Sequence, residues 1–314
     1  MRTLITLAVV CGTAAAFAGC DFSTWAGPGS DMSVPPRSGG DPAAPGARFG
    51  AWVNNAWGPA STLLPLNKEH PPLQGVQACV VEYPALPCAI SDASGRIDIH
   101  GIPVSKPVHI SFRLAGYYGL LLPFDPTAGD FDQPAIEMPS LGLQAALYRQ
   151  LLISEKPGTG GINVFAVDSA DLRPGDAPDH SEANGKRAGV GFKYRRVYVD
   201  ASGAETYGEW SNPASWALSH HSVVYLNDDE SPDLLAMHTS ESGLALAVNL
   251  EPGLYEAITD DTNFTNGLQT LWTRYHWNCG PINHAPSTPG APRIARTLVQ
   301  PGQLSDVRVG CVSE

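Results

Sequence analysis

The chain has 314 residues and a formal net charge of −12, because 31 Asp and Glu residues outnumber 19 Lys and Arg. A surface of this sign repels phosphate groups, so we expect no nucleic-acid partner and no attraction to anionic headgroups. Hydrophobic residues make up 43% of the chain, which is enough for buried cores. The length corresponds to about two domains.

The first residues have the pattern of a secretory signal that ends in a lipid-attachment site. Arg2 precedes an apolar stretch, residues 4–18, that is too short and too rich in Gly and Ala to span a membrane comfortably. The run Phe17–Cys20 resembles a bacterial lipobox, although Phe17 stands where the strongest examples have Leu. The resemblance implies that residues 1–19 are a signal peptide and that Cys20 is lipidated. Ordinary signal cleavage after Ala16 or Ala18 is the alternative.

A lipidated Cys20 predicts a cell-envelope protein, anchored to the inner or outer membrane and either periplasmic or surface-exposed. The membrane itself is then a partner through the lipid, and several acyl chains hold a protein there stably. Residues 20–49 are rich in Gly, Pro, Ser and Ala and are expected to form a disordered spacer.

Four cysteines remain after the signal and the lipid site, and an even number in an oxidising compartment predicts disulfides. Three pairings are possible, and sequence proximity favours Cys79–Cys88 and Cys279–Cys311. No CxxC motif is present, so neither a zinc ribbon nor a redox site is indicated.

Beyond the spacer, the apolar pattern has mostly the period of two that is typical of strands. The segments with this pattern are 76–81, 96–99, 108–114, 162–167, 197–199, 222–226, 244–250, 254–258 and 307–309. Residues 141–153 have the spacing of a helix, which we expect to join two domains, and the polar stretch 168–189 is expected to be a long loop.

A turn-and-strand pattern occurs twice, at residues 91–103 and 239–255. Each copy has hydroxyl and acidic residues that close a turn at a glycine, Gly95 or Gly243, and each continues into a strand and a second turn. These stretches resemble the carboxypeptidase regulatory-like, or transthyretin-like, β-sandwich. The resemblance implies an all-β fold of two transthyretin-like (prealbumin-like) Greek-key sandwiches, at 50–139 and 157–314, with a short linking helix at 140–156. Envelope lipoproteins with such domains are mostly binding or structural modules.

Some sandwiches of this kind are intradiol dioxygenases, which hold ferric iron with two Tyr and two His. Their His ligands lie two residues apart on one strand, and no two His residues here have that spacing, although Tyr275, His276 and His284 follow the second copy. The signatures of HExxH metalloproteases, serine-hydrolase elbows, SxxK acyl transferases and phosphate loops are also absent. We therefore expect no enzyme, no catalytic residue, no metal and no cofactor, with a dioxygenase-like metalloenzyme as an alternative.

Aromatic residues before Cys279 are the best candidates for ligand binding. Trp272, Tyr275 and Trp277 can stack on a sugar face or anchor a protein partner, and core packing is the alternative interpretation. Trp210 and Trp216 pose the same question.

Two further clusters favour plain surface interpretations. His220 and His221 are adjacent and cannot easily chelate one ion from a strand. The acidic run Asn227–Glu230 lacks the ligand spacing of an EF-hand, so we expect a solvated turn and leave calcium open.

The sequence thus predicts a lipid-anchored envelope protein that binds or scaffolds other components without catalysis. An envelope protein or a polysaccharide is the expected partner, and a carbohydrate-binding module that uses exposed aromatics is the alternative.

Overall fold

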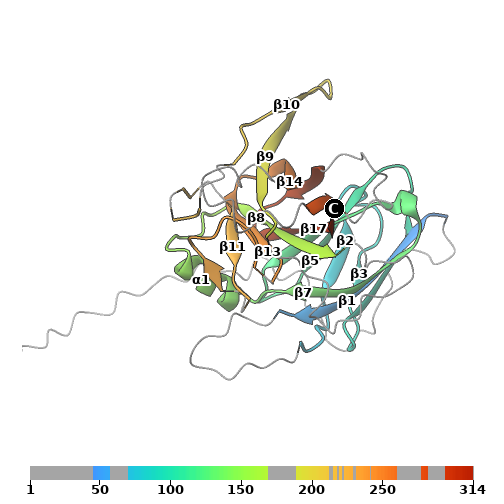
Figure 1. The fold of residues 1–314 in the computed structure, drawn as a ribbon. Coiled ribbons are helices and arrows are strands. Elements are labelled where there is room, and N and C mark those ends of the chain that lie inside the picture. Colours follow the sequence, from blue (N-terminus) through green and yellow to red (C-terminus); the bar gives the residue numbers. More distant parts are fainter. Residues whose placement is uncertain are drawn as a thin grey trace, which may run out of the picture. The chain divides into compact units, whose positions relative to one another are not determined.

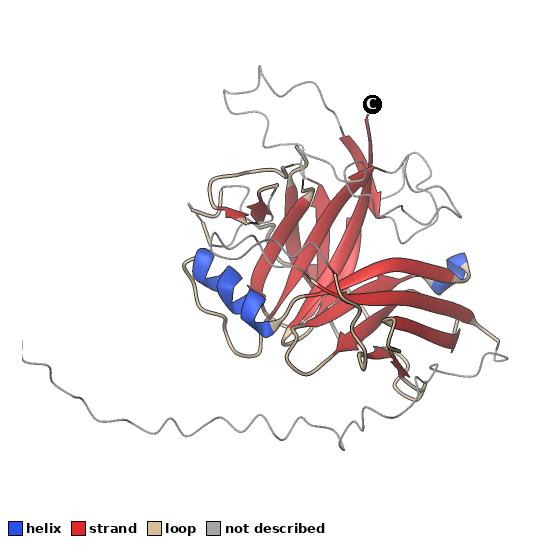
Figure 2. Cartoon of the chain, turned by 90° about the horizontal axis from the view of Figure 1, so that it is seen from below, coloured by secondary structure: helices blue, strands red, loops and turns tan. Residues whose placement is uncertain are grey.

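The computed structural model describes residues 45–56, 70–168, 189–211, 215–217, 219–220, 223–228, 231–240, 242–259, 277–281 and 294–313. All of them belong to one compact unit, Pro35–Glu314. Strands dominate this part of the chain (Figures 1 and 2), which also contains the helix α1 (Leu141–Gln150) and a 3-10 turn, η2 (Pro126–Ala128). The predicted all-β fold class is confirmed.

The first half of the chain forms a sandwich of two sheets. The first sheet has the order β4-β1-β7, with β1 at Ala47–Asn55, β4 at Arg96–Ile102 and β7 at Phe131–Met138. The second has the order β3-β2-β5-β6, with β2 at Gln77–Val80, β3 at Ala89–Ile90, β5 at Val108–Arg113 and β6 at Gly119–Phe124. β1 begins at Ala47, so the last three residues of the predicted spacer, 47–49, belong to this strand.

The second half repeats this arrangement. One sheet contains β13-β8-β17, with β8 at Gly160–Asp168, β13 at Leu244–Leu250 and β17 at Gln303–Ser313. The other is β10-β9-β14-β16, with β9 at Phe192–Val199, β10 at Glu205–Tyr207, β14 at Gly253–Thr259 and β16 at Ile294–Val299. Three short strands are additions to this plan: β11 (Val224–Leu226), β12 (Pro232–Asp233) and β15 (Trp277–Pro281).

The two halves match strand for strand and in direction. The opening strands β1 and β8 each pair antiparallel with a middle strand, β4 or β13, and parallel with the last strand, β7 or β17. The antiparallel ladders β3-β2-β5-β6 and β10-β9-β14-β16 correspond in the same way. The turn-and-strand pattern found in the sequence occupies equivalent places, leading into β4 and β5 in one half and β13 and β14 in the other. We call these halves the first and second repeat.

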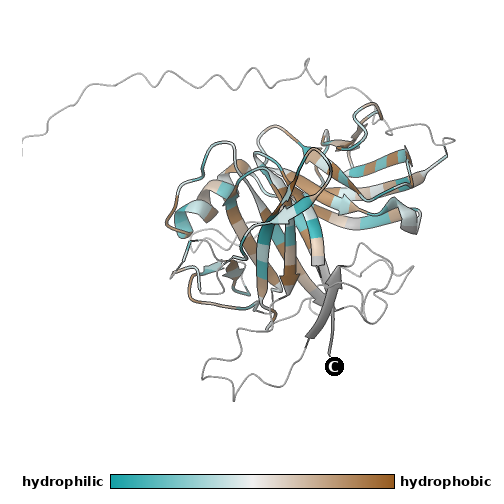
Figure 3. Ribbon diagram, turned by 90° about the horizontal axis from the view of Figure 1, so that it is seen from above, coloured by the Kyte–Doolittle hydropathy of each residue, from teal (hydrophilic) through white to brown (hydrophobic). Residues whose placement is uncertain are grey.

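Each repeat buries its own apolar core between its two sheets. The alternation of apolar and polar residues along the strands is visible as colour bands in Figure 3. Phe49 and Phe112 meet in the first core at a ring distance of 6.2 Å, and both are fully buried. Ile162, Val164 and Tyr255 belong to the second core.

The two repeats share one continuous sheet, which the sequence did not predict. The first residues of β17 pair parallel with β6 of the first repeat, Gln303 opposite Gly119 and Ser305 opposite Leu121. The same strand pairs parallel with β8 of the second repeat over eight positions. The result is a ten-stranded sheet that runs through both sandwiches.

The helix α1 packs on the second repeat and is therefore more than a linker. Ser140 caps its first turn by accepting a hydrogen bond from the Leu143 backbone N–H at 3.2 Å. Tyr148 and Leu151 are buried in a third apolar cluster, with Trp216 and the outer face of β11 and β13. The helix ends at Gln150 and not at residue 153, because the chain turns left-handed at Leu152, with a φ of 57°.

Among the described residues, no helix is long and apolar enough to cross a membrane. The predicted loop at 168–189 lies almost wholly outside the described residues, as do Cys20 and the signal peptide.

Candidate binding surface

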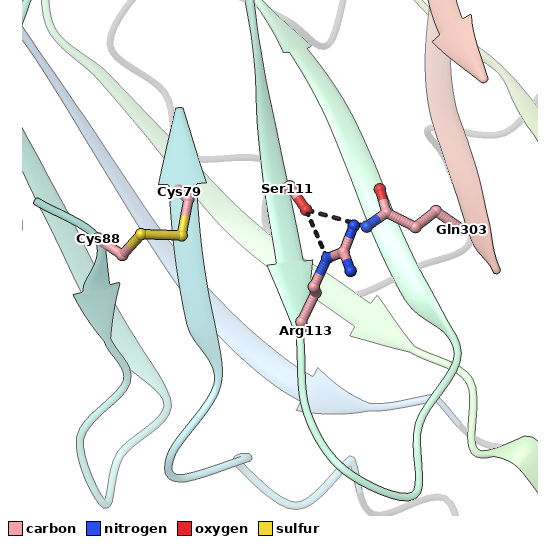
Figure 4. The surroundings of a disulfide bond; sticks show 5 residues. All are labelled: Cys79, Cys88, Ser111, Arg113 and Gln303. Carbon is pink, nitrogen blue, oxygen red and sulfur yellow. Dashed lines mark hydrogen bonds between the residues drawn. A yellow bond between two sulfur atoms is a disulfide. The ribbon is translucent and has the colours of Figure 1, made fainter. Parts of the chain in front are cut away.

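The structure confirms one predicted disulfide and positions the second pair for another. Cys79 on β2 is bonded to Cys88, with 4.4 Å between their Cα atoms (Figure 4). The backbone of Cys279 on β15 lies directly opposite that of Cys311 on β17. Their side chains lie outside the described part, so this bond stays a prediction.

The predicted aromatic set is only partly placed. Trp277 is the first residue of β15, and its side chain is not among those described. Trp272 and Tyr275 lie outside the described residues. The structure therefore does not test the binding role predicted for these three residues.

The two other tryptophans, Trp216 and Trp210, differ in how far they are buried. Trp216 is 2% exposed and donates from Nε1 to the Leu151 carbonyl oxygen at 3.2 Å, so it is a core residue. His220 stacks on its ring at 5.0 Å. Trp210 is half-buried and lies beside the outer face of the four-stranded sheet of the second repeat.

That outer face is built around one buried carboxylate. Arg195 on β9, Glu256 on β14 and Arg296 on β16 are direct cross-strand partners, so their side chains share one face. The Glu256 side chain is 2% exposed. Oε2 accepts from Arg195 at 2.7 and 2.8 Å, and Oε1 accepts from Arg296 at 2.8 and 3.1 Å. The buried charge is thus fully paired and hydrogen-bonded, as burial requires.

Aromatic rings enclose one of these two arginines. The guanidinium carbon of Arg195 lies 4.0 Å from the ring centre of Tyr207 and 4.4 Å from that of Trp210. Lys193, two residues before Arg195 on β9, approaches Trp210 at 5.5 Å. Cation–π contacts at these distances hold the rings in place. Tyr207 remains 45% exposed, so part of its ring faces solvent.

A fourth charged group completes the cluster. Glu205 on β10 pairs with Arg296 through two hydrogen bonds, at 2.7 and 2.8 Å. These bonds, with a smaller contribution from the Tyr207 hydroxyl, lower the pKa of Glu205 to about 2. The Arg296 guanidinium, hydrogen-bonded to Glu205, has its pKa raised in turn.

We call Arg195, Tyr207, Trp210, Glu256 and Arg296, with Glu205, the aromatic–arginine face. Its two arginines and two carboxylates balance each other, so the face is close to neutral while the whole chain is acidic. An exposed ring beside polar groups with fixed directions suits an uncharged ligand with an apolar face and a hydroxyl edge. Among the described residues, no three His, Cys, Asp or Glu side chains are placed to hold a metal ion.

The first repeat carries a charged cluster on its three-stranded sheet. Asp98 on β4 and Asp132 on β7 flank Gly50 of β1 in one cross-strand row. Arg48 and Arg96 each pair with both carboxylates. A side chain at position 50 would overlap these charged groups, so glycine is what lets the four close over the strand.

Sequence reasoning noted Trp210 but missed the rest of the aromatic–arginine face. The available signal was Lys193 and Arg195, two cations at alternating positions of a strand whose opposite face begins with Phe192 and Tyr194. Their partners Glu256 and Arg296 lie 61 and 101 residues away from Arg195, and only the register of three strands brings them together.

Comparisons with known proteins do not assign the chain to a family. No protein-family model matches the chain, and no curated protein matches its sequence. Solved structures with some likeness include the TIE protein of Bacillus anthracis, at a TM-score of 0.23 and 10% identity over 85% of this chain. The match covers 34% of that protein, so this chain spans about a third of its length.

Two pilins show a likeness of the same low level. The minor pilin of Streptococcus agalactiae matches at a TM-score of 0.23 and 12% identity, over 85% of this chain and 96% of the pilin. The shaft pilin of Lactobacillus rhamnosus GG matches at 0.21 and 11% identity, over 86% and 99%. TM-scores this low leave fold and function to be argued from the chain itself.

Proposed function

We propose that this chain is a lipid-anchored cell-envelope protein that scaffolds or binds other envelope components without catalysing a reaction. The observation that carries the proposal is the shared strand β17, which joins the two transthyretin-like repeats into one sheet. A body of this kind presents its surfaces at fixed positions, which suits a scaffold.

Contacts at the junction support its rigidity. The Gly119 N–H donates to the Gly302 carbonyl oxygen at 3.1 Å. Gln303 is 1% exposed and lies against Ser111 and Arg113 of β5 (Figure 4), at 3.0 Å from Ser111 Oγ. With its amide oxygen turned toward Arg113, Gln303 accepts from Nη2 at 2.7 Å and Nε at 2.8 Å. Rotation of one repeat against the other would break these buried bonds, which is unfavourable.

A histidine adds a second bond between the repeats. His109 Nε2 of the first repeat accepts from the Leu298 backbone N–H of the second at 3.1 Å. Nδ1 must then carry the proton, and it lies 2.7 Å from Glu82 Oε1. The carboxylate thereby fixes the tautomer that the inter-repeat bond needs.

The anchor and the spacer complete the proposal. Lipidation at Cys20 would hold the protein at a membrane, and residues 20–49 would separate that membrane from the sheet that begins at Ala47. The acidic net charge would keep the folded part off anionic headgroups.

The aromatic–arginine face favours carbohydrate binding as a second candidate. Tyr207 offers an exposed ring for stacking, and Glu205 and Arg296 beside it offer an acceptor and a donor for hydroxyl groups. The aromatic–arginine face is a further candidate for sugar binding. Trp272, Tyr275 and Trp277, which the sequence proposed for this role, remain candidates beside it.

The anchored scaffold is tested by crosslinking in the native envelope, followed by capture of the full chain. We expect lipid on Cys20, a membrane-bound pool and one stoichiometric envelope partner. The Cys20→Ser variant should lose the lipid and the membrane pool. Wild-type protein that is released without lipid, or that is captured with no partner, would refute the anchored scaffold.

Carbohydrate binding is tested separately with soluble amylose fragments and peptidoglycan fragments. The Tyr207→Ala variant should weaken binding about five- to tenfold, since an aromatic contact contributes roughly 1 kcal/mol. Tyr198→Ala is the matched control, because Tyr198 is 49% exposed on the neighbouring strand but opposite Thr206, and so on the other face. Equal losses in both variants, or no binding by the wild type, would remove the carbohydrate role.

A further inference from the structure

The junction between the repeats contains a histidine whose ring bonds to both of them. Nε2 of His109, on β5 of the first repeat, accepts from the Leu298 N–H of β16 in the second repeat at 3.1 Å. Nδ1 of the same ring lies 2.7 Å from Glu82 Oε1 in the first repeat. The side chain of His109 is 14% exposed, so these two bonds replace water at the ring nitrogens.

Glu82 is held against the ring as a carboxylate. Its second oxygen, Oε2, accepts from the His109 backbone N–H at 2.8 Å. Burial opposes ionisation of Glu82, but its hydrogen bonds to His109 outweigh that effect and lower its pKa below the ordinary value. The carboxyl group is therefore negative at neutral pH.

The two partners of the ring favour different charge states. The Glu82 carboxylate favours the imidazolium, because opposite charges attract at this distance. The Leu298 N–H needs a lone pair on Nε2, and only the neutral ring with its proton on Nδ1 has one there. A proton on Nε2 would set two N–H donors against each other. The bond to the second repeat thus exists only with a neutral ring, whereas the bond to Glu82 exists in both states.

Elements of the first repeat bring no further charge to the ring. The strands on either side of β5, which are β2 and β6, contain no charged residue, and Pro123 is the β6 partner of His109. Arg113 is the other charged residue of β5, and it lies beside Gln303. Among the described residues, Glu82 is thus the charged side chain in ion-pair contact with the ring.

Charged groups of the second repeat near this point are engaged elsewhere. The charged residue of β16 is Arg296, which is paired within the aromatic–arginine face. On β17, Ser305 Oγ donates to the Leu298 carbonyl oxygen, and the next residue, Asp306, accepts from Asn163 of β8 at 3.2 Å. The charge of the ring is therefore set by Glu82 and by the Leu298 N–H.

We propose that His109 is a pH-sensitive latch between the repeats, which releases the Leu298 backbone when the ring is protonated and keeps its contact with Glu82. A histidine changes charge between about pH 5 and 8. The inter-repeat bond is present above the pH at which the ring gains its proton and is lost as the pH falls through it. Pairing of β6 with β17 does not depend on this proton, so acid loosens the edge of β16 without separating the repeats.

NMR of the full chain in detergent, between pH 5 and 8, tests the latch. The ring signals of labelled His109 report its charge, and hydrogen exchange of the Leu298 amide reports the bond. We expect the protection factor of Leu298 to fall about five- to tenfold as the ring gains its proton, the scale of one hydrogen bond. The Val81 amide is the internal control, since it donates to the His109 carbonyl oxygen at 2.9 Å within the first repeat and should keep its protection.

Three variants assign the effect to the ring. His109→Gln keeps an acceptor that cannot be protonated near neutral pH, so Leu298 should stay protected throughout. Glu82→Gln removes the carboxylate that favours the imidazolium, so the loss of protection should move to lower pH. His100→Gln is the matched control, because His100 lies on β4 in the other sheet, and it should behave as the wild type.

Four results would each overturn the latch. They are a ring that stays neutral down to pH 5, constant protection of Leu298 while the ring titrates, an equal loss at Val81, and an unchanged midpoint in Glu82→Gln. Equal losses at Leu298 and Val81 would show that acid opens β5 itself. The midpoint in Glu82→Gln decides the matter even if His109→Gln does not fold.

Discussion

The two repeats have one strand topology, but each carries its charged cluster on a different sheet and arranges it in a different way. In the first, four charged side chains close over Gly50, a strand position with no side chain. In the second, the central strand position is filled by Glu256, which is 2% exposed between Arg195 and Arg296. In both clusters the charges are paired with one another, and in the second two aromatic rings also lie against Arg195.

The difference shows where binding capacity lies in a duplicated fold. The cluster of the first repeat includes one ring, Trp52, which is 39% exposed and lies 4.1 Å from Arg96. The second repeat adds the short strands β11, β12 and β15, packs the helix α1, and carries Tyr207 on the common strand β10. The first repeat keeps to the common plan of strands, and the second carries exposed aromatic side chains on that plan as well as further elements.

The largest expected effect comes from breaking the core of the first repeat. Phe49→Ala removes a fully buried ring that packs against Phe112 and Phe124, and we expect a loss of about 3 to 5 kcal/mol in the free energy of unfolding. Because β17 joins the repeats, both should unfold in one transition. Denaturant titration followed by circular dichroism, with hydrogen exchange read separately for each repeat, measures this.

The matching change in the second core is Ile162→Ala, and it should also destabilise both repeats. Leu152→Ala is the neutral control, since Leu152 is 80% exposed. Two separate transitions, with only the mutated repeat affected, would contradict the shared sheet.

Local alternation predicted β2, β4 and β5 in the first repeat and β8, β9, β11, β13, β14 and β17 in the second, and it missed the other described strands. The segments 96–99, 108–114 and 244–250 alternate cleanly and appear as β4, β5 and β13. β7 was missed, because Phe131–Met138 contains polar residues and a proline in place of alternation. The pairing of β17 with β6 has no local signal, since Gln303 and Gly119 are far apart in the chain and pair in parallel.

Removal of a disulfide should give the next largest loss of unfolding free energy, and each repeat has one observed or predicted disulfide for comparison. Removal of Cys79–Cys88 in the first repeat, by changing both residues to Ser, should cost about 2.5 to 3 kcal/mol from the short loop that it closes. The predicted Cys279–Cys311 bond closes a longer loop in the second repeat, so its removal should cost about 3.5 to 4 kcal/mol. Thermal unfolding of both double variants shows which disulfide contributes more to stability.

Peptide mapping under non-reducing conditions decides whether the second bond exists. Free thiols at Cys279 and Cys311, or equal stability after their replacement, would refute that bond without touching the first. The opposed backbone register of the two residues is the reason to expect it.

A smaller effect is expected from the histidine at the junction. His109→Phe leaves the Leu298 N–H without its acceptor, and we expect a loss of about 1 to 3 kcal/mol and a broader unfolding transition. His70→Phe is the control, because it removes a His–Glu pair with Glu137 that lies inside the first repeat. In urea unfolding, the slope of the unfolding free energy against urea concentration should change for His109→Phe alone. Equal slopes for the two variants would show that the bond does not couple the repeats.

Candidate sites were harder to predict than strands because, like the pairing of β17 with β6, they bring together residues that are far apart in the chain. Glu256 and Arg195 look like ordinary surface charges in sequence, and only their position as cross-strand partners makes one of them buried. The sequence singled out Trp210 as an aromatic residue, but not the guanidinium that holds it.

The smallest expected effect is the acid response of the first cluster. Hydrogen bonds from Arg48, and then from Arg96, lower the pKa of Asp132 below its ordinary value of 3.8. A lowered folded-state pKa means that the contribution of Asp132 is present above the unfolded pKa and is lost as the pH falls through the folded value. Asp132→Asn should therefore cost about 1 kcal/mol or less at neutral pH and flatten the loss of stability below about pH 4.

Asp130→Asn is the control for this change, since Asp130 is a neighbouring carboxylate that accepts the Arg48 backbone N–H at 2.7 Å. In the second repeat, the pKa of Glu205, paired with Arg296, falls to about 2, so this pair should persist to about that pH. Acid titration of the unfolding free energy, with Glu205→Gln beside Asp132→Asn, measures the pH at which each pair is lost. A common midpoint for both would mean that the two clusters, for all their difference in burial, hold their carboxylates equally.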